Sequence, residues 1–191
     1  MKWLLAHLRG VCYQAKIILM PDIELLAPDQ WTRLRDLRLS ALQDSPSMFL
    51  ATYDRERTFS QEQWRAEFDR GEWYYCTADG QPISLLGVTR EPGRPADECY
   101  IEYLWVSPGF RRRGVALNML KSILRSVRDS GVRTAYLWVL DGNDSAVRLY
   151  QRVGFVSTNH MQPIETRPGR TEERMALLLD GPDWRPIRPA C

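Results

Sequence analysis

Arg111-Arg112-Arg113-Gly114-Val115-Ala116 is the stretch that decides the fold class, because it stands between an apolar segment, 100–106, and an amphipathic segment that begins near Gly114. The apolar segment predicts a strand and the amphipathic segment a helix. The first backbone amides of a helix have no partner inside it, and the helix dipole favours negative charge there. The stretch therefore predicts a turn that binds a phosphate or pyrophosphate group. The alternative is an ordinary turn glycine beside three solvated arginines.

Hydrophobic periodicity and turn signals predict the elements around this turn. In order, they are a strand at 21–26, a helix capped by Asp29 that ends before Pro46, a helix at 60–69 opened by a Ser-x-x-Gln capping box, a hairpin of 73–78 and 81–90 around an Asp-Gly turn, a strand at 100–106, a helix at 114–130, a strand at 134–140, a helix at 143–154 closed by a glycine, and a last strand at 174–179. This order predicts an α/β fold with a mixed sheet. A single domain is expected over residues 20–181, between an N-terminal extension, 1–19, and a proline-rich tail, 182–191.

Composition narrows the class of protein. The chain has 191 residues, 44% of them hydrophobic, with 26 basic and 24 acidic side chains, which is typical of one soluble globular domain. The arginines are dispersed and no apolar run reaches a membrane-spanning length, so we expect no nucleic-acid or membrane partner. Four cysteines without a C-x-x-C pair and two histidines predict reduced thiols, a cytoplasmic location and no metal. A monomer or a homodimer is expected.

A carboxylate interrupts the apolar segment Tyr100-Ile101-Glu102-Tyr103-Leu104-Trp105-Val106. Alternate residues of a strand share a face, so Glu102 is expected beside Leu104 and Val106 on the apolar or cleft side. Apolar surroundings raise the pKa of a carboxyl toward neutrality, which suits a general base. The alternative is an edge carboxylate paired with an arginine.

The run from Val106 to Ala116, followed by Asn143-x-x-Ala146-x-x-Leu149-Tyr150 and then Gly154-Phe155, resembles the GNAT superfamily of acetyl-CoA-dependent N-acetyltransferases. The resemblance covers residues 22–180. It implies a central, mostly antiparallel sheet flanked by helices, with strands near 100–106 and 134–140 that lie side by side and splay apart to admit the thioester. It also implies acetyl-CoA as co-substrate and no metal. One departure is Arg112, at a position that is frequently glycine in the family.

The resemblance also implies the roles of individual residues. Backbone amides from Arg112 to Ala116 would hold the pyrophosphate, and the strand backbone at 104–106 would bond the pantetheine arm. The tetrahedral oxyanion is expected to be met by a backbone amide of strand 100–106. Asn143 would contact the cofactor arm or a bridging water, cap a helix, or do both. Glu102 is the expected base and Tyr150 the expected acid, unless the tyrosine ring only packs on the sheet. The full set of expected cofactor-binding residues is Leu104, Trp105, Val106, Arg111, Arg112, Arg113, Gly114, Val115, Ala116, Asn143, Ala146 and Tyr150.

The expected reaction is transfer of an acetyl group to a primary amine of a small molecule or protein by direct attack. Another acyl-CoA, a hydroxyl acceptor, and a non-catalytic acetyl-CoA sensor or scaffold remain alternatives, although Glu102 together with Tyr150 favours an enzyme. Acceptor specificity is expected in segments 28–72 and 157–172, where the loop 44–59 either covers a cleft or is anchored by its aromatic residues. Several acidic residues either attract a cationic amine or form solvated surface: Asp54, Glu56, Glu62, Glu165, Glu172 and Glu173.

Overall fold

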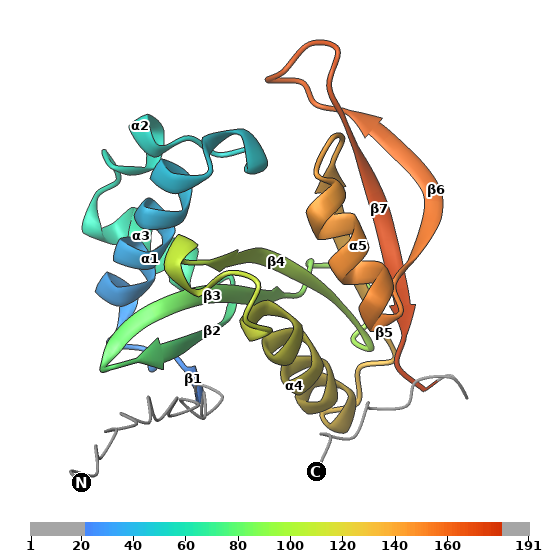
Figure 1. The fold of residues 1–191 in the computed structure, drawn as a ribbon, viewed down its shortest axis with the longest axis horizontal. Helices are drawn as coiled ribbons and strands as arrows, with labels where there is room; N and C mark the ends of the chain where they lie inside the picture. Colours follow the sequence, from blue (N-terminus) through green and yellow to red (C-terminus); the bar gives the residue numbers. More distant parts are fainter. Residues whose placement is uncertain (1–21, 181–191) are drawn as a thin grey trace, which may run out of the picture.

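The computed structural model describes residues 22–180, which form a mostly antiparallel sheet flanked by helices (Figure 1). The elements are β1 (Ile23–Leu25), α1 (Trp31–Asp44), α2 (Tyr53–Glu56), α3 (Gln61–Phe68), β2 (Gly71–Ala78), β3 (Gln81–Thr89), β4 (Glu98–Val106), α4 (Val115–Asp129), β5 (Thr134–Leu140), α5 (Asp144–Val153), β6 (Val156–Pro163) and β7 (Thr171–Leu178), with 3-10 turns at Pro46–Met48 and Pro108–Phe110. The predicted α/β fold is confirmed. The expected extension, 1–19, and tail, 182–191, lie outside the described residues.

The order of strands in the sheet creates an opening at its centre. The strands follow the order β1-β2-β3-β4-β5-β7-β6, and β4–β5 is the parallel pair among otherwise antiparallel neighbours. This pair is joined only from Glu98 beside Thr134 to Tyr100 beside Tyr136. Beyond those residues the two strands diverge (Figure 1). The predicted splay of the two strands is thus confirmed.

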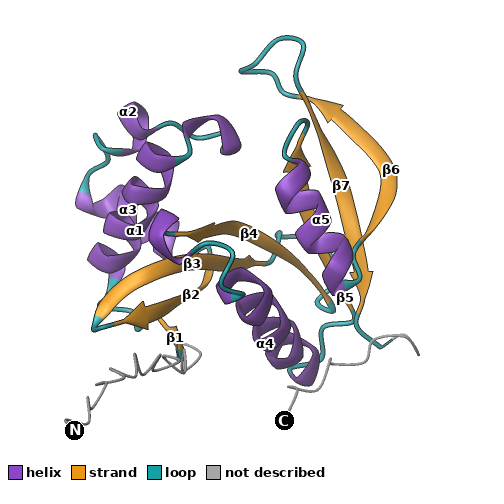
Figure 2. Cartoon of the chain, in the orientation of Figure 1, coloured by secondary structure: helices purple, strands orange, loops and turns teal. Residues whose placement is uncertain are grey.

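The two faces of the sheet carry separate hydrophobic cores (Figure 2). Successive strand residues point to opposite faces, so neighbours such as Tyr75 and Cys76 belong to different cores. Helices α4 and α5 cover one face, with Leu120 and Tyr150 in its core. Helices α1 and α3 cover the other face, with Leu34 and Phe68 in that core. The opening between β4 and β5 therefore joins two helical layers.

One prediction about the elements is wrong, and one strand was missed. Asp29 does not cap α1, because the amide of Gln30 donates to the carbonyl of Ala27 in a turn and the helix begins only at Trp31. Strand β6 was not predicted, because it lies at the edge of the sheet with most side chains exposed and lacks an apolar alternation. By contrast, the capping box of Ser60 and Gln63 at α3 is confirmed.

A bulge changes the direction of side chains in β4. Tyr103 has a φ of 57°, and the β3–β4 register shifts at this level. Leu104 packs in the core under α4, whereas Tyr103 packs in the core under α1 and α3. The prediction that Glu102 shares a face with Leu104 and Val106 is wrong, because an inserted residue breaks the two-residue alternation.

A buried ion pair joins α1 to α2. The guanidinium of Arg38 donates to both carboxylate oxygens of Glu56 at 3.0 and 2.9 Å, and it lies 3.9 Å from the ring centre of Tyr103. Each of the two charged residues is only 5% exposed. Glu56 is therefore not part of a solvated acidic surface, and its pairing holds α2 against the rest of the fold.

Removal of one partner from this pair is expected to destabilise the protein strongly. Glu56→Ala leaves the guanidinium of Arg38 buried and unpaired, which costs about 3–5 kcal/mol of unfolding free energy. The matched control is Asp54→Ala, because Asp54 forms its ion pair with Arg57 while 87% exposed, and such a pair contributes at most about 1 kcal/mol. Urea unfolding of the two variants measures the difference. Equal losses would contradict the role given to the buried pair.

Candidate active site

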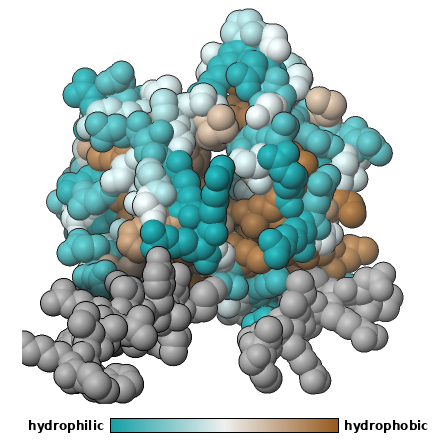
Figure 3. Space-filling model, viewed as in Figure 1, coloured by the Kyte–Doolittle hydropathy of each residue, from teal (hydrophilic) through white to brown (hydrophobic). Residues whose placement is uncertain are grey.

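A cleft of about 1610 Å³ opens where β4 and β5 separate. Its walls come from the diverging ends of these strands, the beginnings of α4 and α5, the segment 44–51 and the segment 162–166. On the face that carries α4 and α5, apolar surface lies between hydrophilic groups (Figure 3). The cleft is thus bounded by both halves of the splayed sheet.

The cleft gathers nearly all of the predicted site residues. Arg113 is the exception: its guanidinium lies over the ring of Phe110, 5.4 Å from the ring centre. The predicted residues that line the cleft are Glu102, Leu104, Trp105, Val106, Arg111, Arg112, Gly114, Val115, Ala116, Asn143, Ala146 and Tyr150.

The turn before α4 has unpaired backbone amides. Gly114 is the N-cap of α4 and has a φ of 83°, a left-handed conformation that favours glycine. Within the described residues, no protein group accepts a hydrogen bond from the amides of residues 112–117. Arg112 also has a positive φ, 60°, a conformation that glycine adopts with less strain than arginine. The turn therefore has the backbone geometry of an anion site.

The side chain of Arg111 forms hydrogen bonds within the protein. Its Nε donates to the carbonyl of Val106 at 2.8 Å, and its Nη2 binds the carboxylate of Asp44. Trp105 donates to the same carboxylate at 2.9 Å. Burial opposes ionisation of Asp44, but the hydrogen bonds from Trp105, Ser45 and Arg111 together lower its pKa. These bonds fasten the end of α1 to the turn and leave the anion site to backbone amides.

The facing edges of β4 and β5 supply further backbone groups. Since the two strands stop pairing after Tyr100 and Tyr136, their edges at 101–106 and 137–140 do not pair with each other. Peptide groups along these edges can bond an extended chain that enters the cleft. An amide-containing ligand arm matches this pair of edges.

Glu102 lies at the side of the cleft that faces α3. Burial raises the pKa of its carboxyl, the charge of Arg70 opposes that rise, and the charge of Glu67 adds to it. The Nη2 atom of Arg70 lies 4.0 Å from Oε2 of Glu102 while the same guanidinium hydrogen-bonds Glu67 at 3.0 Å. Oε2 is buried without a hydrogen-bond partner among the described residues. The carboxylate is thus paired with Arg70 only at 4.0 Å, and its Oε2 accepts no hydrogen bond from the described residues.

Tyr150 and Asn143 both combine a structural position with access to the cleft. Tyr150 is 9% exposed and its ring meets Phe155 edge-on at 5.9 Å, so the ring does pack in the core. Burial raises its pKa to about 12, which keeps the hydroxyl protonated at neutral pH. Asn143 caps α5 by accepting from the amide of Ala146 at 3.3 Å. Tyr150 therefore packs in the core and Asn143 caps a helix, and both residues also line the cleft.

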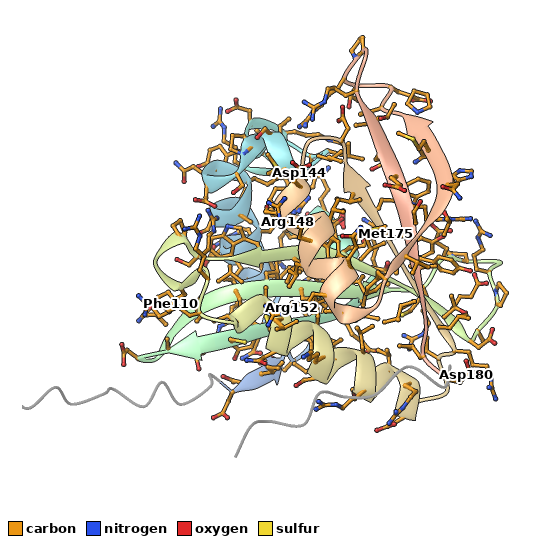
Figure 4. All side chains as sticks on the ribbon, turned by 45° about the vertical axis from the view of Figure 1, so that its right-hand side comes forward. Phe110, Asp144, Arg148, Arg152, Met175 and Asp180 are labelled. Carbon is orange, nitrogen blue, oxygen red and sulfur yellow. The ribbon has the colours of Figure 1, made fainter. Side chains whose placement is uncertain are left out.

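Several residues of the cleft were not predicted from the sequence. The charged ones are Arg38, Asp44, Arg55, Glu67, Arg70, Asp144 and Arg152. Arg152 and Asp144 extend from α5, and Phe110 lies in the turn before α4 (Figure 4); all three line the cleft. Burial and then the positive charge of Arg152 lower the pKa of Lys121 on α4, so Arg152 adds positive potential beside that helix. An arginine on an amphipathic helix carries no signal that separates it from solvated surface.

Two alternatives were open for the acidic residues of the acceptor segments: attraction of a cationic amine at the cleft, or a solvated surface. Some residues fit the first and others the second. Glu172 is 7% exposed, accepts a hydrogen bond from Gln162 at 2.7 Å, and lines the cleft. Glu165 lines the cleft but is exposed. Asp54 and Glu62 are exposed and lie outside the cleft lining. Asp54 and Glu62 thus belong to a solvated surface, whereas Glu165 and Glu172 lie on the cleft wall.

Among residues 22–180, no group of three or more His, Cys, Asp or Glu side chains is arranged to hold a metal ion. No helix in the same range has the length and apolarity to cross a bilayer. Cys76 and Cys99 are buried free thiols.

A comparison with protein families supports what the fold and the cleft indicate. The sequence model of the Acetyltransferase (GNAT) family matches residues 31–155. This chain therefore belongs to the GNAT family of acetyltransferases. The splayed β4–β5 pair and the turn before α4 lie within the matched range.

Individual relatives are similar over part of their length. The chain is 29% identical over 87 residues to the uncharacterized N-acetyltransferase YdgE of Bacillus subtilis, covering 46% of this chain and 55% of that protein. It is 38% identical over 74 residues to the mycothiol acetyltransferase of Propionibacterium freudenreichii, covering 38% of this chain and 23% of the relative. The chain thus spans about half or less of these curated relatives.

Solved structures share the fold at low identity. The ribosomal-protein-S18-alanine N-acetyltransferase from Escherichia coli superposes with a TM-score of 0.64 at 17% identity, covering 86% of this chain and 98% of that one. A GNAT-family acetyltransferase from Streptococcus pneumoniae has a TM-score of 0.67 at 17% identity, covering 82% and 99%. These likenesses establish the fold.

Proposed function

We propose that this protein transfers the acetyl group of acetyl-CoA to a primary amine. The observation that carries the proposal is the continuity of one cleft, from the unpaired amides at 112–117, along the open edges of β4 and β5, to Glu102 and Tyr150. The amides suit a pyrophosphate and the strand edges suit an amide-containing arm. Acetyl-CoA supplies an acetyl group activated as a thioester.

The chain's own residues account for the proton transfers. A protonated amine cannot attack a carbonyl, so a base must first remove a proton. Glu102 lines the cleft, has a raised pKa, and has a buried Oε2 without a hydrogen-bond partner among the described residues. The Tyr150 hydroxyl stays protonated at neutral pH and supplies the proton that a leaving thiolate needs. We assign stabilisation of the carbonyl oxygen to a backbone amide of the bulge at Tyr103, where the strand leaves its regular pairing.

A screen of primary amines with acetyl-CoA tests the proposal. We expect release of free thiol above the rate of hydrolysis for at least one amine, with a stoichiometric acetylated product identified by mass spectrometry. Tight acetyl-CoA binding with no thiol release for any amine would instead favour a sensor. Release with another acyl-CoA or a hydroxyl acceptor alone would favour a different acyltransferase.

Tyr150→Phe is expected to separate acid catalysis from packing. The ring that meets Phe155 is retained and only the hydroxyl is lost, so acetyl-CoA affinity and Tm should change little. Loss of a general acid lowers kcat by about 10²-fold. Steady-state kinetics with an accepted amine, together with calorimetric titration of acetyl-CoA, measures both quantities. A kcat equal to that of the wild type would remove Tyr150 from the mechanism.

A further inference from the structure

One arginine ties the two sides of the cleft together. Arg167, in the loop between β6 and β7, donates to the main-chain oxygens of Ser47 at 3.1 Å, Pro46 at 3.2 Å and Phe49. Residues on both sides of this contact line the cleft: 45–51 on one side and 162–166 on the other. The contact therefore spans the opening between the two halves of the molecule.

The loop that carries Arg167 is held in place by its own bonds. The amide of Ile164 donates to the carbonyl of Arg170 at 2.9 Å, and the amide of Arg167 donates back to the carbonyl of Ile164 at 2.9 Å. The side chain of Arg170 binds Asp141 at the end of β5 through a carboxylate oxygen and the main-chain oxygen, each at 2.7 Å. Ile164 is 6% exposed and anchors the loop. The loop is thus a fixed support for the side chain of Arg167.

The segment 46–49, whose carbonyls bind Arg167, lies just after a residue that is bonded to β4 and to the turn before α4. Asp44, at the end of α1, accepts hydrogen bonds from Trp105 of β4 and from Arg111. The next residues form the 3-10 turn Pro46–Met48, whose last carbonyls have no partner within the turn. A planar guanidinium with several donors can satisfy these carbonyls together. Arg167 therefore caps this turn from the opposite wall of the cleft.

Residues of α1 to α3 line one side of the cleft that contains Glu102, and residues of β5 to β7 line the other side. The bonds from Arg167 to residues 46–49 join these two sides next to the lining residues 164–166. An amine on a slender molecule can enter a cleft joined in this way end-on. A lysine on the surface of a folded protein is flanked by the rest of that protein, so its approach requires an open groove.

From this geometry we infer that Arg167 is a specificity-determining residue, and that its tie restricts the acceptor to slender small-molecule amines. The inference rests on the proposed acetyl transfer, because it narrows the class of acceptor for the same site. Arg167 touches no reacting group in this account; it acts by holding the two sides of the cleft together.

A width series of acceptors tests the inference. The probes are n-hexylamine, cyclohexylmethylamine and 1-adamantylmethylamine, which are similarly basic and increase in width, together with folded lysozyme. The wild-type kcat/KM should fall steeply with width, and lysozyme should not be acetylated. Arg167→Ala should raise the ratio of wide to slender kcat/KM by about tenfold or more, equivalent to about 1.4 kcal/mol.

Two further variants separate geometry from charge. Arg167→Lys keeps the charge but lacks the planar fork, so it should resemble Arg167→Ala. Arg133→Ala removes an exposed arginine that pairs with Asp180, away from the cleft lining, and should keep the wild-type width profile. An unchanged width profile in Arg167→Ala, or wild-type acetylation of lysozyme at a rate per amine equal to that of n-hexylamine, would overturn the inference.

Hydrogen exchange tests the tie without turnover. Residues 45–50 should exchange about tenfold faster in Arg167→Ala than in the wild type, and at the wild-type rate in Arg133→Ala. Equal exchange in all three proteins would overturn the tie. If the tie is present but no amine in any screen is acetylated, the proposed acetyl transfer fails while the tie across the cleft stands.

Discussion

Gly114→Val is expected to abolish useful binding of acetyl-CoA. Gly114 has a φ of 83°, and a β-branched residue is strained in that conformation. The turn must then rotate, and the amides at 112–117 lose their common direction. We expect an affinity loss of at least about 100-fold, equivalent to about 2.7 kcal/mol, because the backbone carries the anion site. Calorimetric titration of acetyl-CoA measures it.

Neighbouring positions of the same turn provide the controls. A Cβ at Gly109 meets nothing within 4 Å, so Gly109→Ala should bind acetyl-CoA like the wild type. Arg112→Ala keeps the amide and should also change affinity little, and Arg112→Gly suits the φ of 60° better than arginine does. A folded Gly114→Val protein with near-wild-type affinity would contradict the account of the turn.

Glu102→Gln is expected to lower kcat/KM by about 10²- to 10³-fold, because glutamine keeps the shape of the side chain but accepts no proton. The wild-type rate should rise with pH through a pKa above the ordinary glutamate value, since burial raises the pKa of this carboxyl. The variant should lose that rise. pH profiles of kcat/KM for both proteins, measured with the same amine, test this. A wild-type rate in Glu102→Gln would remove the residue as the base.

Glu102→Gln is expected to lower the rate but not the stability of the protein. The folded-state pKa of Glu102 lies above its unfolded value, so the ionised carboxylate disfavours the fold. This cost is absent below the unfolded pKa and develops as pH rises through the folded pKa. Glu102→Gln should therefore be at least as stable as the wild type at neutral pH, and the difference should vanish near about pH 4. Lower stability of the variant at neutral pH would indicate a structural carboxylate.

Sequence patterns predicted the features that depend on neighbouring residues. The amides before α4 are free because of a local turn with Gly114, and the β2–β3 hairpin follows from its Asp-Gly turn. Glu102 was singled out by its apolar neighbours in the strand. Its face could not be predicted, because the bulge at Tyr103 depends on pairing with β3.

The chain's sequence by itself determined the glycine turn before α4, the order of most elements and Glu102 as the candidate base, because capping, turns and hydrophobic period act over a few residues. Tyr150 became the candidate acid through the resemblance to the GNAT family. Only the tertiary structure decided that Glu56 and Glu172 are buried, that Asp44 holds Arg111, and that Arg167 spans the cleft. Each of these features joins segments far apart in the chain, so no local pattern records it.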